Sequence, residues 1–148
     1  MFRLIPRDFA CGRSLFLDSL KETPEPTAKV FVKICLDGDV GASFYAQVDT
    51  GAAWSILASS VAARLGLLGL TGTSMILSTQ LGRMKGVLVR IPVRFLADAG
   101  DPFDTEGTFF ISPDWPSGLT FLGYSGLLDS IRFALDSQRN HFYFGPGD

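Results

Sequence analysis

Short segments in which apolar and polar residues alternate recur along most of this chain, and they constrain its fold more than any other feature. Residues 29–36 and 43–48 are two such segments, joined by Asp37-Gly38-Asp39, which is a typical hairpin sequence. Because successive side chains of a strand point to opposite faces, this alternation predicts strands with one buried face. We therefore expect a mostly β chain.

The pattern continues toward the C-terminus. Residues 74–96 form a long β-like stretch that is interrupted at 80–83. Within it, Pro92 favours an edge position, because proline has no N–H to donate to a neighbouring strand. The apolar residues 109–111 predict one more short strand.

Two segments are typical of helices. Residues 55–67 end at a glycine-containing turn, and residues 125–131 form a shorter helical patch. A terminal hairpin, with strands at 132–135 and 141–144, completes the chain. Many short strands with one or two short helices predict a small closed β-barrel.

The N-terminal part of the chain differs from the rest. Residues 14–20 predict a helical turn or two, and the proline-containing segment 23–27 then interrupts regular structure. We therefore divide the chain into an N-terminal arm, residues 1–27, and one domain, residues 28–148. The arm could dock on the barrel, strap a dimer together or lie over a cleft.

Composition excludes several classes of protein. Of the 148 residues, 47% are hydrophobic and 19% are charged, and the formal net charge is −2. Such a chain can bury a core and is not of the disordered class. Its lysines and arginines are scattered, so it lacks the basic cluster that binds a phosphate backbone, and we expect no nucleic-acid partner.

Cysteine and histidine are too few to indicate a metal or cofactor site. Cys11 and Cys35 lie far apart, and we interpret them as buried free thiols, with a disulfide as the alternative. His141 lies in an aromatic strand pattern, and the chain has no nucleophile elbow, so a Ser–His–Asp triad is not indicated. The acidic residues between 98 and 106 lack the spacing of an EF-type calcium loop. We expect no metal and no cofactor.

No segment is typical of a membrane or exported protein. Charged residues interrupt every apolar run before it reaches the length of a signal peptide, and none approaches the roughly 20 apolar residues of a membrane span. We therefore expect no membrane partner and a cytoplasmic protein.

The motif that indicates chemistry is Asp49-Thr50-Gly51. It follows the predicted strand 43–48 directly, and its glycine permits a tight turn. A carboxylate at a strand end is exposed at a rim while its backbone is rigidly held, as a general acid or base requires. In the alternative interpretation, Asp49 only hydrogen-bonds its own turn.

Three landmarks together resemble the retropepsin-like aspartic peptidases, and they span about residues 30–144. They are Val48-Asp49-Thr50-Gly51-Ala52 followed by Ser55-Ile56-Leu57 and Leu65-Gly66-Leu67, then Phe121-Leu122-Gly123 with the helix at 125–131, and a candidate flap hairpin at 78–86. The resemblance implies an acid-protease-type barrel that functions as a two-fold dimer.

The resemblance also implies an activity, that of an aspartic endopeptidase. Such enzymes need two carboxylates that share one proton. This chain carries a single motif, because Glu106 separates Thr105 from Gly107 in the only similar segment, which begins at Asp104. The second carboxylate would be Asp49 of another subunit, so we expect a homodimer that binds a peptide or protein substrate.

Roles at the site follow from the same resemblance. Thr50 would hydrogen-bond across the dimer axis and hold the two carboxylates coplanar, and Gly51 would leave room for the substrate backbone. The expected substrate-binding residues are Ala52, Ala53 and Trp54 beside the motif, and Leu81 and Gly82 at the flap tip, which would close over the peptide.

Two departures from the family pattern leave alternatives open. Ala53 and Trp54 stand where retroviral enzymes carry acidic residues that grip the substrate, and Tyr124 stands where they carry a bracing arginine. Trp54 packs in the core or forms a pocket wall, and Trp115 covers the core or makes a dimer contact. The missing acidic residues motivate an alternative function, a catalytically silent dimer that acts as a peptide-binding or assembly module. An unrelated β-barrel that binds a small apolar ligand is a further alternative.

Overall fold

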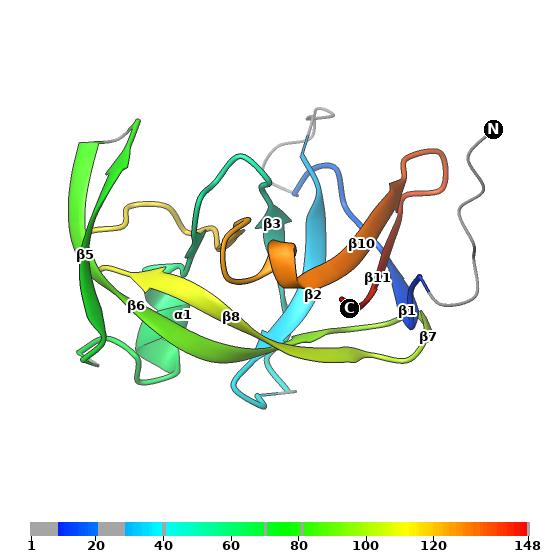
Figure 1. Cartoon of the computed structure of the whole chain (residues 1–148), viewed down its shortest axis with the longest axis horizontal. Coiled ribbons are helices and arrows are strands. Elements are labelled where there is room, and N and C mark those ends of the chain that lie inside the picture. Colours follow the sequence, from blue (N-terminus) through cyan, green and yellow to red (C-terminus); the bar gives the residue numbers. More distant parts are fainter. Residues whose placement is uncertain (1–8, 21–28, 40, 70, 81, 148) are drawn as a thin grey trace.

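A computed structural model describes residues 9–20, 29–39, 41–69, 71–80 and 82–147 (Figure 1). The chain is mostly β, as the sequence predicts, and its strands form two sheets. The elements are β1 (Gly12–Leu15), β2 (Phe31–Leu36), β3 (Phe44–Val48), β4 (Ser55–Ile56), α1 (Ser59–Arg64), β5 (Thr73–Thr79), β6 (Gly82–Phe95), β7 (Ala99–Gly100), β8 (Phe103–Ile111), β9 (Phe121–Leu122), the 3₁₀ turn η1 (Leu128–Ser130), β10 (Ile131–Asp136) and β11 (His141–Pro146).

The larger sheet closes on itself. Its strand order is β2-β3-β9-β4-β8-β6-β5, and a further pairing joins β2 to β6. Six strands of the described chain therefore form a ring, to which β5 is attached through its hairpin with β6. The prediction of a small closed β-barrel is confirmed. Its two-fold dimer stays a prediction.

The long strand β6 belongs to both the barrel and a hairpin that extends from it. The edge of β6 that faces away from β8 pairs with β5 as far as Leu88 and with β2 from Val93 onward. Pro92 lies between these two pairings, and its carbonyl accepts a hydrogen bond of 2.9 Å from the N–H of Asp37. The expected edge position is therefore not found: β6 is a central strand, and Pro92 lies in the gap between its pairings with β5 and β2, where the ladder on that side is interrupted.

The smaller sheet lies at the other end of the molecule from the β5–β6 hairpin (Figure 1). Its order is β10-β11-β1-β7, and the predicted terminal hairpin forms its β10–β11 pair. Phe142 and Phe144 of β11 are fully buried, and their rings lie 6.0 and 5.6 Å from the ring of Phe95 on β6. This aromatic packing joins the smaller sheet to the barrel.

The prediction of helical turns at 14–20 is wrong. Residues 12–15 form β1, which pairs with β11 and β7, and Leu17 forms an isolated bridge with Phe31. Burial alternates along this strand: Gly12 and Ser14 are buried, whereas Arg13 and Leu15 are exposed. Pairing with a strand far away in the sequence decides this conformation, which local propensity cannot reveal. Residues 12–15 of the predicted arm thus dock on the domain, while the division at residue 27 stays a prediction.

Both predicted helices are shorter than expected. Residues 55–67 contain α1 only at 59–64, because Ser55 and Ile56 form β4 between β8 and β9. Residues 125–131 contain only the 3₁₀ turn η1. The short strand expected at 109–111 begins much earlier, at Phe103, because β8 pairs with β6 along nine residues.

Candidate active site

The end of β3 carries the Asp-Thr-Gly motif. β3 runs parallel to β9, with Gln47 opposite Phe121 and Val48 opposite Leu122. The N–H of Asp49 continues this pairing with a 2.9 Å hydrogen bond to the carbonyl of Leu122. The chain turns immediately afterward, so Asp49 stands at the point where a fixed strand becomes a loop.

The turn after β3 holds one oxygen of Asp49. The N–H of Gly51 donates a 3.0 Å hydrogen bond to Asp49 Oδ1, and the N–H of Ala52 donates a 3.2 Å bond to the carbonyl of Asp49. This is an Asx turn, which aspartate forms readily with the backbone two residues on. Asp49 is half-buried, and among the described residues its Oδ2 atom has no hydrogen-bond donor. One carboxylate oxygen is thus positioned and the other is available.

Residues 123–125 support the loop from below. The N–H groups of Tyr124 and Ser125 each donate a 2.8 Å hydrogen bond, to the carbonyls of Ala52 and Ala53 respectively. Trp54 and Ser125 also form an isolated β-bridge. The loop 49–54 is therefore fixed through its main chain along most of its length, which is the preorganisation that a catalytic carboxylate needs.

Gly123 allows the closest approach at the site. A Cβ atom there would overlap the carbonyl group of Trp54 and lie 2.7 Å from the N atom of Ser55. The N–H of Gly123 donates a 2.9 Å hydrogen bond to Ser55 Oγ, and both residues are buried. Ser55 enters the family resemblance only as part of the landmark 55–57, and its hydrogen bond to Gly123 was not predicted, although a serine that opens an apolar run is a signal of a buried hydrogen bond.

The predicted substrate-binding residues beside the motif lie together. Thr50, Gly51 and Ala53 are exposed, and Ala52 and Trp54 are half-buried. Trp54 belongs to neither of the two buried apolar clusters of the described chain. Thr50 makes no side-chain hydrogen bond within the described residues, so its hydroxyl is available to a group outside this chain.

The candidate flap is the β5–β6 hairpin. Thr79 pairs with Gly82, and the hydroxyl of Thr79 donates a 3.2 Å hydrogen bond to the Gly82 carbonyl. Gly82 has a φ of +112°, a conformation that favours glycine. Leu81 lies outside the described residues.

A small apolar cluster anchors the base of this hairpin. Met84 of β6 packs with Ile56, Phe110 and Trp115, and the half-buried Met75, Leu77, Leu88 and Phe121 pack against them. Trp115 covers this cluster, edge-on to Phe121 at 5.8 Å, as the interpretation of a core lid expected. Because Phe121 and Ile56 belong to β9 and β4, the hairpin rests on the strands that flank the Asp49 loop.

One buried polar atom near the motif has no partner. Gln47 lies two residues before Asp49, so their side chains leave the backbone on the same side. Gln47 Oε1 is the single buried side-chain polar atom of the described residues without a hydrogen-bond partner. A buried, unpaired amide oxygen lowers the stability of the fold, because it has given up its bonds to water.

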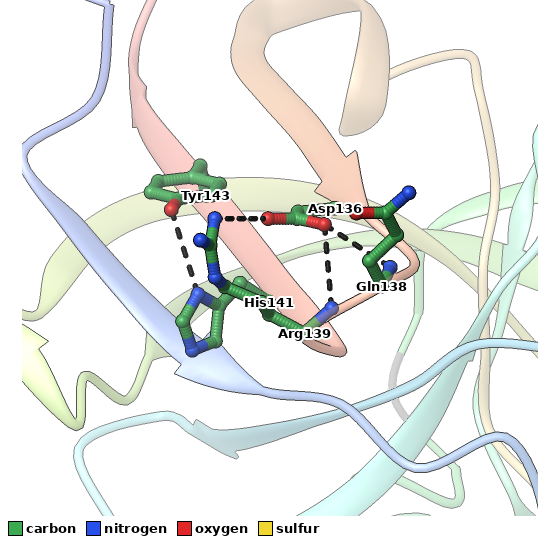
Figure 2. A network of polar contacts seen from close by, with 5 residues as sticks. All are labelled: Asp136, Gln138, Arg139, His141 and Tyr143. Atoms are coloured by element: carbon green, nitrogen blue, oxygen red, sulfur yellow. Dashed lines mark hydrogen bonds and ion pairs between the residues drawn. The ribbon is translucent and has the colours of Figure 1, made fainter.

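Histidine and the two cysteines lie away from this loop. His141 is in β11, where its Nδ1 lies 3.5 Å from the hydroxyl of Tyr143, next to a turn held by Asp136 (Figure 2). Cys11 and Cys35 are both free thiols, but only Cys35 is buried as expected, whereas Cys11 is half-buried; desolvation raises the pKa of both thiols. Within the described ranges, no three His, Cys, Asp or Glu side chains are grouped so as to hold a metal ion. No helix in those ranges is long and apolar enough to cross a bilayer.

Comparisons with known proteins identify the fold. No protein-family model matches the sequence, and no curated protein is significantly similar to it. Among solved structures, a retropepsin-like aspartic protease from Rickettsia conorii is 19% identical, covers 88% of this chain and 97% of its own, and superposes with a TM-score of 0.54. The retroviral protease-like domain of Ddi1 from Leishmania major is 22% identical, covers 80% of this chain and 94% of its own, and has a TM-score of 0.48. The likeness to the Rickettsia structure shows that this chain has a retropepsin-like fold.

Proposed function

We propose that this chain is an aspartic endopeptidase whose active form is a homodimer with one Asp49 from each subunit. The observation that carries the proposal is the set of hydrogen bonds that fixes the Asp49 carboxylate and its loop. The N–H of Gly51 fixes Oδ1, hydrogen bonds from residues 124 and 125 fix the loop, and Oδ2 is left for chemistry. A structural aspartate at a turn needs only the first of these features.

The proposed mechanism uses two carboxylates and a water molecule. Two Asp49 side chains at a dimer axis would share one proton, because like charges so close together cannot both ionise. The ionised carboxylate accepts a proton from the water while the water oxygen bonds to the peptide carbonyl carbon, and the protonated carboxylate donates a hydrogen bond to the carbonyl oxygen, whose π electrons it receives as the tetrahedral intermediate forms. Transfer of a proton to the peptide nitrogen then lets the tetrahedral intermediate release the amine.

A second subunit is needed in this proposal because one chain supplies only one candidate catalytic carboxylate. The sequence carries a single Asp-Thr-Gly motif. Asp104, in the only similar segment, lies on β8, where Arg94 of β6 donates hydrogen bonds of 2.6 and 2.8 Å to its two carboxylate oxygens. Asp104 is thus committed to an ion pair, and the exposure of Thr50 supports the proposal that it would contact a partner loop.

An extended peptide is the proposed substrate. Ala52, Ala53 and Trp54 would line the cleft, and their small or apolar side chains favour apolar substrate residues over charged ones. The β5–β6 hairpin, whose last described pair is Thr79 with Gly82, would close over the peptide and exclude water. The apolar cluster at its base would then act as a fixed support for this movement.

Cleavage of a diverse peptide mixture tests the proposal. Wild type, Asp49→Asn and Asp114→Asn would be compared from acid to neutral pH, with the oligomeric state of each measured by sedimentation. In Asp49→Asn the side chain keeps an oxygen for the N–H of Gly51 but loses the ionisable group, so the variant should fold and dimerise without cleaving. Asp114 is an exposed aspartate of the loop after β8, and its replacement is the matched control.

The outcomes separate the candidate functions. Products from wild type and Asp114→Asn alone support the peptidase. A well-folded dimer that captures peptides without cleaving them, and does so equally after Asp49→Asn, favours the silent peptide-binding module that Ala53 and Trp54 motivate. A monomer that yields no products contradicts both.

A further inference from the structure

Arg90 of β6 contacts the turn that supports the candidate active-site loop. Its Nη1 atom donates a 3.1 Å hydrogen bond to the carbonyl of Gly126 and a 3.0 Å bond to Thr108 Oγ1. The N–H of Thr108 donates a second bond, of 3.1 Å, to the same Gly126 carbonyl. Two donors from two neighbouring barrel strands therefore converge on one carbonyl oxygen.

The backbone conformation of Gly126 and its close approach to β8 restrict the position of this carbonyl. Gly126 has a φ of +78°, and a Cβ atom there would lie 2.7 Å from Thr108 Oγ1. The N–H of Gly126 is in turn bound to Asp129 Oδ1 at 3.1 Å. The turn thus packs closely against β8, and both the N–H and the carbonyl of Gly126 are hydrogen-bonded.

A short path of main-chain bonds leads from this carbonyl to Asp49. Residues 124 and 125, directly before Gly126, donate the hydrogen bonds that fix the carbonyls of Ala52 and Ala53. The side chain of Tyr124 takes no part, because it is 52% exposed and its hydroxyl makes no hydrogen bond within the described residues. Among the hydrogen bonds of the described chain, Arg90 supplies the only charged side chain of β6 that reaches this turn.

Ion pairing does not account for the placement of Arg90. Its Nη2 lies 3.6 Å from Glu106 Oε2, and the two side chains are 55% and 61% exposed. Pairs of this kind contribute little to stability, because water screens them and both side chains lose rotamer freedom. The two hydrogen bonds from Nη1 have a more specific geometry than this ion pair, and they fix the position of the Gly126 carbonyl relative to β6 and β8.

We propose that Arg90 is a positioning residue, which holds the 123–126 turn against the barrel and thereby keeps the Asp49 loop in its reactive geometry. The inference rests on the proposed peptidase function. Arg90 also lies on the strand that forms one side of the candidate flap, eight residues after Gly82. The same strand therefore carries the candidate flap and the guanidinium that binds the Gly126 carbonyl.

The test compares Arg90→Gln and Arg90→Lys with Arg94→Gln. Arg94 is the matched control, because it lies on the same strand and its guanidinium forms a bidentate ion pair with Asp104 rather than a bond to the turn. Two kinds of measurement are made on the dimer: steady-state kinetics, which give kcat and KM for a cleaved peptide, and hydrogen exchange of the Tyr124 and Ser125 amides.

Arg90→Gln should lower kcat about tenfold while KM stays within about twofold, since a small misplacement of reacting groups has effects of this size or larger. The two amides should exchange about tenfold faster, because a local opening has become easier. The ammonium of Lys can replace Nη1 at the Gly126 carbonyl, so Arg90→Lys should recover part of both effects. Arg94→Gln should change neither.

Two results would overturn the role of Arg90. One is unchanged exchange at residues 124 and 125 in Arg90→Gln. The other is a loss of protection and activity that Arg94→Gln reproduces, which would indicate a general effect on the barrel. If wild type cleaves no peptide, the proposed function fails, but the exchange comparison still decides whether Arg90 holds the turn.

Discussion

Replacing Gly123 by alanine should disturb the candidate site more than any other single-methyl change. The added Cβ would overlap the carbonyl group of Trp54 and lie 2.7 Å from the N atom of Ser55. All of these neighbours are backbone atoms at the junction of the loop 49–54 with β4. They cannot rotate away as a flexible side chain can, so β9 and the loop must separate.

The structure sets the expected magnitude. Forcing an extra methyl into a well-packed site costs typically about 1–3 kcal/mol, and contact with backbone on three atoms favours the upper part of that range. Alanine lowers the entropy of the unfolded chain, which offsets roughly 0.4–1 kcal/mol. We expect a net loss of about 2 kcal/mol in the free energy of unfolding, which is a fall of roughly 4–8 °C in Tm for a domain of this size.

Urea unfolding of Gly123→Ala and Gly118→Ala provides the assay. A Cβ atom added at Gly118 would have no heavy atom within 4 Å, and its φ is not positive, so this replacement controls for the change in unfolded-state entropy. Gly123→Ala should be less stable than wild type by about 2 kcal/mol, and less stable than this control by about 2.5–3 kcal/mol because the control keeps the entropy gain, with an unchanged m-value. Under the proposed function, it should also lose about 100-fold in kcat, because the loop shifts by a fraction of an ångström or more. Equal stability of the two variants would refute the inference that residues 123 and 54 are in rigid contact.

Two further predictions concern the barrel. Hydrogen bonds from Arg94 lower the pKa of Asp104 below its ordinary value, so the stabilisation from this pair is present above the unfolded pKa of about 3.9 and is lost as pH falls through the folded pKa. In an NMR titration Arg94→Gln should move the Asp104 pKa back upward, and an unmoved pKa would contradict the assigned cause. Gln47→Met should raise the free energy of unfolding by about 1 kcal/mol, since it removes a buried oxygen that has no partner, and urea unfolding would show a loss instead if Gln47 were satisfied in solution.

Local patterns were sufficient to predict most of the barrel. The hairpin of β2 and β3, the break between β5 and β6 and the terminal hairpin all follow from alternation and turn residues, which are properties of neighbouring residues. The turn at Asp49 was also predictable, because an aspartate readily accepts a hydrogen bond from the backbone N–H two residues on.

The missed features depend on residues that are far apart in sequence. β1 forms a strand because β11 lies beside it, and β4 is a strand because β8 and β9 enclose it. The two hydrogen bonds to the Gly126 carbonyl come from Arg90 and Thr108. These residues lie opposite each other only because of the register between β6 and β8. The hydrogen bond between Ser55 and Gly123 likewise forms only because β4 pairs with β9.

Subunit mixing tests the central claim most directly. Wild type and Asp49→Asn would be combined at a fixed total concentration, allowed to exchange subunits, and assayed for peptide cleavage across the range of mole fractions. If both carboxylates of a dimer are required, mixed dimers are inactive, and an equal mixture should retain about one quarter of the wild-type activity. An activity of about one half, falling linearly with the wild-type fraction, would mean that each chain acts alone and would contradict the shared Asp49 pair.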